Sequence, residues 1–532
     1  MRILAVLWFS LKILSWFTFR AFFQLFRHVA WIFRGVSSQA RRNLSAKHLH
    51  GVAHVQRIRY RFKIDPMIQP ASLNNFVTTH ERFADADYVM KPNVTLYTLT
   101  NDSAVFVEAG NDEDATSSKH SSFFRIAQFQ LAQRLIIIPL HAFHTLARDV
   151  TAPEERLIFL TNTSRCGSTL LTQVFEETGK SIAISEPDAM YAISVLMEKN
   201  PDQDFSDLCI STVRMLCKPV SPEKNIYVIK LSQQTICLTP VLVQLFPKSK
   251  HLFMYRNGLK VAQSVAKLMR SLPYLEFIFQ FAHYSCCMNV ARRMTTKFGL
   301  PTSDFDNVNN LISPIYCGAI LWASSIAKYK QFKRDKLPVV AVRYEDMVNE
   351  SHYALEQIFN YCGLPYQREA TDRAFGRDSQ ENSPISRSSL KKFEKEDKII
   401  SEEATRNIDK VCRSLNVPRL YERFIAQDTI TYKTSVSDTS ASAVLEVEVR
   451  AVSCQNARTI KSHQRNDSGV SLGSNYSGND VTSSSPAEAG NAPKQNKQSC
   501  AVVEIENVRE KLLKDSLPDV AFVNSAFVQI EV

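Results

Sequence analysis

Residues 157–169 (LIFLTNTSRCGST) run from an apolar strand through a turn of small residues into the start of a helix. Backbone N–H groups at a helix start, together with neighbouring hydroxyls, can surround a phosphate, and a glycine lets the backbone approach it closely. The pattern predicts an anion-binding loop, with an ordinary capped helix as the alternative. The residues expected to bind the anion are Arg165, Cys166, Gly167, Ser168 and Thr169.

Two further stretches place polar residues where a strand is expected to end. Arg256 follows an apolar run, and Ser264 comes eight residues later, so both can face one ligand from a strand end and a helix. The run 339–343 ends in an arginine that is followed by Tyr-Glu-Asp. The loop at 164–169 lacks the first glycine and the lysine of a Walker A loop, which argues against ATP or GTP hydrolysis.

In the order and placement of these three stretches, the chain resembles the sulfotransferase superfamily, enzymes that use 3′-phosphoadenosine 5′-phosphosulfate (PAPS). The resemblance covers about residues 156–365. It implies that residues 164–169 hold the 5′-phosphosulfate and that Arg256 and Ser264 hold the 3′-phosphate. PAPS is then the expected co-substrate, and no metal is expected. A basic run at 386–392 is a further candidate for the 3′-phosphate, with a solvated surface as its alternative.

Sulfuryl transfer passes through an in-line, charge-rich transition state, so positioning and cations are expected to dominate its catalysis. Arg165 is the expected cation at the leaving end of the phosphosulfate. Lys230, at the end of the apolar run 226–231, resembles a lysine that many family members place near the leaving group. A solvent-facing lysine at a strand end is the alternative for Lys230.

The acceptor hydroxyl also needs a base. Cytosolic members of the family use a histidine at the position of Ser232, which cannot serve alone. Other branches use a glutamate just after the strand that follows the phosphate-loop helix, and Glu186 fits that position. Glu186 is therefore the expected base, and Asp188 is the competing candidate. The alternative for Glu186 is a structural role, as a carboxylate that interacts with the dipole at a helix N-terminus.

Five short apolar runs alternate with longer helical patterns from residue 156 onward. Near-continuous apolar strands between helices are typical of a parallel sheet covered on both faces. We therefore expect a three-layer, P-loop-like α/β catalytic domain over 151–430, with residues 272–333 mainly helical. The candidate strands are 156–161, 181–185, 226–231, 251–255 and 339–343.

Residues 1–36 read as one amphipathic helix rich in Leu, Ile, Phe and Trp. At 100° per residue, its five cations project between about 120° and 200°, so they share one stripe. That geometry favours a membrane anchor lying in the interface, with its cations facing anionic headgroups. A mitochondrial presequence and a tilted signal anchor with snorkelling cations are the alternatives.

The net charge of +11 comes from the same end of the chain. Residues 1–64 contain 12 Lys and Arg and no Asp or Glu, whereas the remaining 52 cations face 53 acids, so a nucleic-acid-binding body is not expected. A basic linker over 37–84 and a small β and helical appendage over 85–150 are expected next. The appendage elements are strands at 88–90, 95–99 and 104–108 and a helix at 122–147 interrupted near Pro139.

Residues 431–532 form a polar tail. Ser, Asn and Gly make up 18 of the 40 residues in 461–500, a composition that cannot offset the entropy of ordering, so disorder is expected. A short helix at 502–513 and a C-terminal Ile-Glu-Val that resembles a PDZ ligand follow. Eleven cysteines without metal-ligand spacing predict neither a zinc site nor a disulfide framework.

The expected function is transfer of a sulfuryl group from PAPS to an acceptor hydroxyl at a membrane, with a carbohydrate, a protein tyrosine or a lipid as acceptor. A catalytically weak nucleotide-binding scaffold and a nucleotide-dependent kinase are the alternatives. The expected location is a Golgi or other secretory membrane, which seven Asn-x-Ser/Thr sequons permit. The cytosolic face of a membrane and the mitochondrion are the other locations considered.

Overall fold

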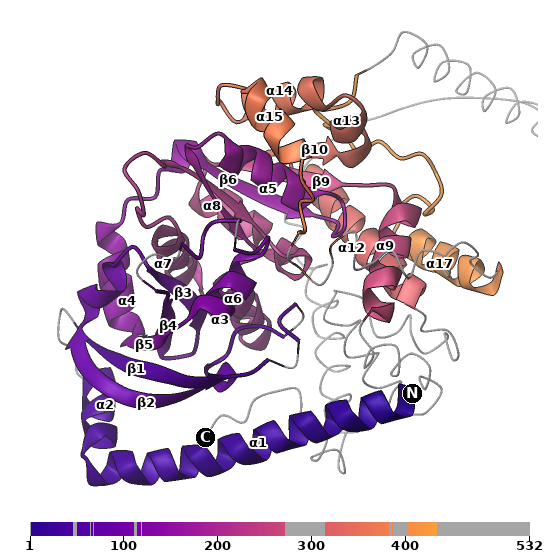
Figure 1. Ribbon diagram of the computed structural model, residues 1–532. Coiled ribbons are helices and arrows are strands. Elements are labelled where there is room, and N and C mark those ends of the chain that lie inside the picture. The colour runs from indigo at the N-terminus through magenta and orange to yellow at the C-terminus, as the bar shows by residue number, and fades with distance from the viewer. Residues whose placement is uncertain are drawn as a thin grey trace, which may run out of the picture. The chain divides into compact units, whose positions relative to one another are not determined.

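The computed structural model describes residues 2–45, 51–63, 65–67, 69–110, 114–118, 120–271, 314–381, 383, 386 and 402–433 (Figure 1). Most of the predicted helical segment 272–333, most of the basic run 386–392 and the tail beyond residue 433 lie outside these residues. The short helix at 502–513 and the PDZ-like terminus therefore stay predictions.

Five strands form the parallel sheet that the sequence predicts. Their order is β10-β9-β6-β8-β7, and every neighbouring pair is parallel. The predicted apolar runs coincide with these strands to within one residue at each end. The strands are β6 (Leu157–Asn162), β7 (Ser181–Ser185), β8 (Ile226–Lys230), β9 (Lys250–Tyr255) and β10 (Val339–Arg343).

Helices cover both faces of this sheet, as the three-layer prediction requires. The helices are α5 (Ser168–Glu177), α6 (Asp188–Lys199), α7 (Ser206–Leu216), α8 (Thr239–Leu245), α9 (Gly258–Arg270), α12 (Pro314–Arg334), α13 (Tyr344–Asn349), α14 (Ser351–Tyr361), α15 (Arg368–Phe375) and α17 (Glu402–Ser414). Short 3-10 helices are η3 (Glu154–Arg156) and η4 (Gln233–Leu238).

Side chains of β6 alternate between two cores because successive residues of a strand point to opposite faces. Ile158 and Leu160 pack in one core with residues of α5 and α14. Leu157 and Phe159 pack in the other core with residues of α7 and α8. A third core joins β9 and β10 to α9, α12 and α17. Burial on both faces explains why these strands are almost wholly apolar.

The first strand of the parallel sheet in chain order, β6, lies in the middle of the sheet, between β8 and β9. The chain leaves β6 toward β7 and β8 on one side and later adds β9 and β10 on the other. In open α/β sheets, ligands bind outside the carboxyl ends of the strands at such a switch point. The predicted anion-binding loop directly follows β6, so the topology places it there.

The prediction of a basic linker over 37–84 is wrong. This stretch forms α2 (Val36–Ser45), β1 (Val52–Arg61) and β2 (Phe76–Asp85), with the 3-10 helix η1 (Leu73–Asn75) between the strands. The first half of β1 is buried, whereas Arg57, Arg59 and Arg61 lie exposed in its second half and give the segment its linker-like charge. The strand forms because it pairs with β2 and with β5, which its own sequence does not show.

The predicted appendage over 85–150 belongs to the same antiparallel sheet, whose order is β2-β1-β5-β4-β3. The predicted strand at 88–90 is a 3-10 helix, and the predicted helix at 122–147 is two helices with a strand between them. The β-branched residues of that strand favour pairing between β1 and β4 over a helix. The elements are η2 (Ala86–Met90), β3 (Val94–Leu99), β4 (Ser103–Glu108), α3 (Phe124–Leu131), β5 (Arg134–Pro139) and α4 (Leu140–Asp149).

The two sheets share a hydrophobic core. Phe106 of β4 and Ile136 of β5 pack in the same core as Phe159 of β6 and Ile184 of β7. Contiguous packing of this kind identifies one core rather than two. The predicted boundary at residue 150 therefore does not separate an appendage from a catalytic domain.

The long N-terminal helix that the sequence predicts is α1 (Arg2–Phe33), which contacts β2 of the antiparallel sheet (Figure 1). Within the described parts of the chain, no helix is long and apolar enough to cross a membrane. Arg20 and Arg27 of α1 contact the protein, since they donate hydrogen bonds to Asn74 and Thr78. These two cations therefore do not point away from the protein, as an anchor with headgroup-facing cations requires.

Lys218, just after α7, ties the helices of the parallel sheet to the antiparallel sheet. Its buried Nζ donates hydrogen bonds to the carbonyls of Val89, Lys91 and Val94 at 2.7, 2.6 and 2.6 Å. An ammonium has three donors, so this arrangement uses all of them.

We expect Lys218→Met to lower the free energy of unfolding by about 2–4 kcal/mol, because three carbonyls lose their donor. Equilibrium denaturation measures the change. The control is Lys248→Met, since Lys248 is 68% exposed and its ion pair with Glu155 lies on the surface, so its effect should stay below about 1 kcal/mol. Equal stability of the two variants would contradict this role of Lys218.

Candidate functional site

The predicted site residues gather at the carboxyl edge of the parallel sheet. The loop 163–167 follows β6, Glu186 follows β7, Lys230 ends β8 and Arg256 follows β9. Because parallel strands end at one edge, residues far apart in the chain come together there.

The loop after β6 has an unusual backbone. Ser164, Arg165 and Gly167 have φ values of +59°, +48° and +83°, a region that residues other than glycine rarely adopt and that is found mainly at functional sites. Asn162 Oδ1 stabilises the turn by accepting from Ser164 N at 2.8 Å. The loop leads into α5, whose first N–H groups have no partner within the helix.

Gly167 is required by close packing as well as by its φ. A Cβ atom at this position would lie 2.5 Å from the ring of Tyr344. The face of the same ring contacts Arg256, whose Cζ lies 4.4 Å from the ring centroid. Tyr344, from the Arg-Tyr-Glu-Asp run, therefore packs beneath the loop and supports a predicted binding cation.

The ammonium of Lys230 lies at the centre of the site. The side chain is 2% exposed, and its Nζ lies 3.0 Å from Glu186 Oε1. It also donates to Thr169 Oγ1 at 3.1 Å and to Ser185 Oγ at 3.2 Å. Lys230 is thus a buried cation that connects the phosphate loop to the predicted base, and the alternative of a solvent-facing lysine is wrong.

Glu186 lies between two cations. Its Oε2 lies 3.3 Å from Arg125 Nη2, opposite the contact with Lys230. Burial alone would raise the pKa of the Glu186 carboxyl, but Lys230 and Arg125 outweigh it and hold that pKa below its ordinary value. Glu186 is therefore ionised at neutral pH, as a proton acceptor must be.

Asp188 belongs to a neighbouring ion-pair group. Its Oδ1 lies 3.8 Å from Arg125 Nη1, and its Oδ2 lies 3.6 Å from Lys63 Nζ. Oδ2 also accepts a hydrogen bond from Ala71 N at 2.7 Å. Burial lowers the pKa of Lys63 to about 8, although Asp188 acts in the opposite sense. Asp188 is thus engaged with the N-terminal part of the chain and is the weaker candidate for the base.

Arg125 and Lys63 are not found by reasoning from the sequence. Arg125 comes from α3, and Lys63 follows β1, both in the part of the chain predicted to be a linker and an appendage. No motif marks either residue, because their partners lie in the parallel sheet. The part of the chain that precedes the parallel sheet therefore supplies two cations to the site.

The guanidinium of Arg165 points toward the proposed 3′-phosphate residues. Its Nε donates to Ser264 Oγ at 2.9 Å, and its Nη1 donates to Gln380 Oε1 at 3.1 Å. Burial and the nearby Arg256 lower the pKa of Arg165 to about 10, so it remains charged at neutral pH. Arg256 Nη1 in turn lies 3.4 Å from the carbonyl of Arg165. In this structure Lys230, rather than Arg165, lies beside Glu186.

Cys166 faces the core. Its side chain is fully buried, and Sγ lies 3.3 Å from the carbonyl of Met254. Burial raises the pKa of the Cys166 thiol, which disfavours the thiolate needed for nucleophilic or ligand chemistry. Cys166 therefore shapes the loop by packing, and any contact of this residue with an anion has to come from its backbone.

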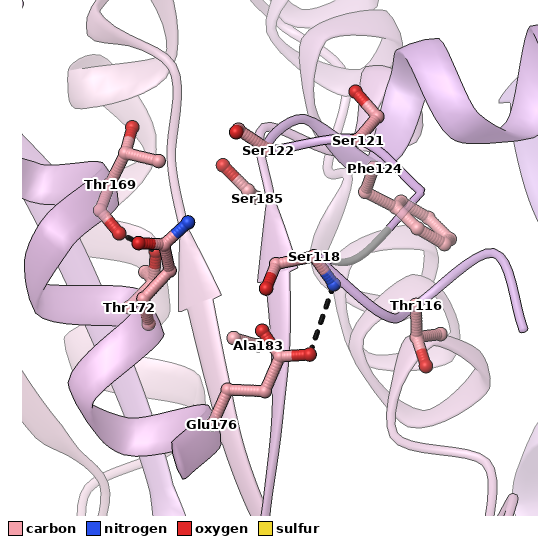
Figure 2. Close-up of a pocket in the computed structure, with 11 residues that line it drawn as sticks. Thr116, Ser118, Ser121, Ser122, Phe124, Thr169, Thr172, Glu176, Ala183 and Ser185 are labelled. Atoms are coloured by element: carbon pink, nitrogen blue, oxygen red, sulfur yellow. Dashed lines mark hydrogen bonds between the residues drawn. The ribbon is translucent and has the colours of Figure 1, made fainter. Parts of the chain in front are cut away.

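A small polar pocket of about 10 Å³, room for about one water molecule, adjoins the site. Figure 2 shows hydroxyl side chains of the segment before α3 facing those of α5 and β7, with Ser118 N donating to Glu176 Oε1 at 2.9 Å. The pocket shares Thr169 and Ser185 with the Lys230 site. It is smaller than most pockets that hold a cofactor, so we do not assign the nucleotide to it.

The site thus combines a turn with left-handed backbone angles, several cations and the carboxylate of Glu186. Among the residues that the structure describes, no group of three or more His, Cys, Asp or Glu side chains is arranged to hold a metal ion. Ser232 lies at the start of η4, with its Oγ 3.4 Å from Thr235 Oγ1. The chemistry available is anion binding and proton transfer.

Neither a protein-family model nor a curated protein matches this chain. Among solved structures, it is similar to the sulfotransferase domain from the curacin biosynthetic pathway, with 15% identity, 49% of this chain and 97% of that chain covered, and a TM-score of 0.29. It is also similar to sulfotransferase STF9 from Mycobacterium avium, with 10% identity, 52% of this chain and 82% of that chain covered, and a TM-score of 0.30. A third similar structure is mouse sulfotransferase SULT7A1 complexed with PAP, with 15% identity, 60% of this chain and 93% of that chain covered, and a TM-score of 0.26. At such TM-scores, the assignment of function rests on the geometry of the site.

Proposed function

We propose that this protein transfers a sulfuryl group from PAPS to an acceptor hydroxyl. The observation that carries the proposal is the position of Lys230, a buried cation in contact with both Thr169 of the phosphate loop and the carboxylate of Glu186. A cation between an anion-binding loop and a base is the arrangement that transfer from a phosphosulfate to a hydroxyl requires.

The donor set fits the two anionic ends of PAPS. The N–H groups at the start of α5 and the hydroxyls of Ser168 and Thr169 would hold the 5′-phosphosulfate. Arg256 and Ser264 would hold the 3′-phosphate together with Arg165, which contacts each of them.

In the proposed reaction Glu186 accepts the proton of the acceptor hydroxyl, whose oxygen attacks sulfur. The new S–O bond forms as the bond from sulfur to the 5′-phosphate oxygen breaks, so the products are the sulfated acceptor and 3′-phosphoadenosine 5′-phosphate (PAP). Lys230 compensates the negative charge that develops on the leaving oxygen. No oxidant, reductant or metal is needed.

We place this reaction at a membrane surface, as the amphipathic pattern of residues 1–36 indicates. The acceptor classes under consideration are a carbohydrate, a protein tyrosine and a lipid. Transfer from ³⁵S-labelled PAPS to extracts separated into these classes identifies which one is modified. Tight binding of PAP without transfer to any class would instead favour a nucleotide-binding scaffold.

We expect Arg256→Ala to weaken PAP binding by about tenfold to a hundredfold, because a charge-assisted contact to the 3′-phosphate is lost. Isothermal titration calorimetry with PAP measures the affinity. Arg373→Ala is the matched control, since Arg373 is 55% exposed and pairs with Glu177 away from the loop. An Arg256 variant that folds and binds PAP like the control would remove Arg256 from the site.

Glu186→Gln should keep PAP binding and lose about a hundredfold or more in turnover, because the amide preserves the shape of the side chain but cannot accept a proton. Steady-state transfer from labelled PAPS measures the loss. Glu155→Gln serves as control, since Glu155 is 78% exposed. Turnover near that of the control would move the role of base to another group, with Asp188 tested next.

Arg125→Gln should move the acid limb of the kcat/KM profile upward by about one pH unit. The cation holds the pKa of Glu186 down, so its removal lets Glu186 take up a proton at a higher pH and become inactive as a base. Arg125→Lys keeps the charge and should restore the profile. Arg134→Gln, which loses contacts to Glu81 and Glu108 instead, should leave the limb in place. An unshifted limb in Arg125→Gln would contradict this role.

A further inference from the structure

One side of α1 is an exposed apolar face. Its members have exposed side chains and include large aromatic residues: Trp8, Leu11, Leu14, Phe22, Leu25 and Phe26, which are 64% to 69% exposed. Phe33, at the end of the helix, is 86% exposed. Contiguous apolar patches of this kind mark interaction sites in proteins.

We propose that α1 is a single-leaflet membrane anchor whose apolar face enters one leaflet of an anionic bilayer while its opposite side stays docked on the antiparallel sheet. The partner is a lipid surface. The proposal concerns attachment and is independent of the transfer reaction.

The docked side of α1 is held by specific contacts along much of its length. Arg27 Nη1 donates to Thr78 Oγ1 at 2.8 Å, and Arg20 donates to Asn74. The ring of Trp16 lies 5.0 Å from that of Phe62, and the ring of Trp31 lies 5.1 Å from that of His54. These contacts tie α1 to β2, to β1 and to the segment that follows β1.

The exposed face and the docked side lie on opposite sides of the helix. At 100° per residue, the exposed apolar residues named above project within about 60° of 20°, whereas Arg20 and Arg27 project near 180° to 200°. From Trp8 to Phe33 the face is about 38 Å long. A helix held against a sheet along this length cannot also be surrounded by lipid, so it lies parallel to the membrane surface.

Charge favours a lipid surface over a second copy of the chain. The first 64 residues contain 12 cations and no acid. Arg34, Arg41, Arg42 and Arg57 have exposed side chains around α1 and β1. Two copies facing each other would bring like charges together, whereas anionic headgroups complement them.

The test uses the full chain and vesicles of phosphatidylcholine with or without phosphatidylserine. We expect flotation with the phosphatidylserine vesicles, and Phe22→Ser with Phe26→Ser should weaken partitioning at least about tenfold. The control replaces exposed residues away from α1, Val348→Ser with Tyr421→Ser, and should bind like the wild type. Equal binding by both double variants would overturn the proposal.

The orientation of α1 is tested separately. Arg20→Ala with Arg27→Ala should increase hydrogen exchange in α1 and β2 without lipid, and should weaken vesicle binding by less than about threefold. If these arginines instead contacted headgroups, binding would fall about thirtyfold and exchange would not change. That result would overturn the docked orientation.

Two further measurements distinguish a lipid surface from a second copy of the chain as the partner of α1. Brominated lipid should quench the fluorescence of Trp8, so Trp8→Phe removes the quenching and Trp31→Phe leaves it. Light scattering of the lipid-free protein tests for a second copy, and we expect the mass of a monomer. A dimer that Phe22→Ser with Phe26→Ser dissociates, together with no vesicle binding, would assign the face to self-association and overturn the proposal.

Discussion

The ammonium of Lys230 is a charge without access to water, and much of the site is arranged to compensate it. Moving an unpaired charge into a protein interior costs several kcal/mol. Lys230 recovers this cost through Thr169 at the start of α5, Ser185 at the end of β7, and Glu186 just beyond it. The ring of Phe123, before α3, lies 4.8 Å from the same ammonium. The end of β8 thereby sets the positions of three neighbouring segments, and the site is organised before any ligand arrives.

Compensation does not end at Glu186, because a carboxylate beside one buried cation is itself a buried charge. Arg125 contacts both Glu186 and Asp188, and Asp188 also contacts Lys63. Charges therefore alternate in a row from Lys230 to Lys63, with each carboxylate between two cations. The row begins at the end of β8 in the parallel sheet and ends just after β1 of the antiparallel sheet. It explains how a base can remain ionised in a largely desolvated place, which burial alone would prevent.

Reasoning from the sequence succeeded where a local pattern and a local structure coincide. The parallel strands were predictable because burial on both faces leaves continuous apolar runs, and the turn after β6 because its small residues follow one of them. The stretch 37–84 was mistaken for a linker because the exposed arginines of β1 hide a strand that forms by pairing with β2 and β5. Arg125 was missed for the same reason, since its role is set by contacts across the chain. The sequence pattern revealed the stripe of cations on α1, but it could not show that the antiparallel sheet faces this stripe.

The row of alternating charges limits where this chain can be cut into a shorter fragment or joined to another protein by recombination. A fragment beginning at residue 151 would retain the whole parallel sheet and the phosphate loop. It would nevertheless lose Phe123, Arg125 and Lys63, and would leave Asp188 as a carboxylate without its cations. Recombination that transplants only the parallel sheet would meet the same penalty. A protein that evolved from this one could therefore lose the antiparallel sheet only if Asp188 were also replaced.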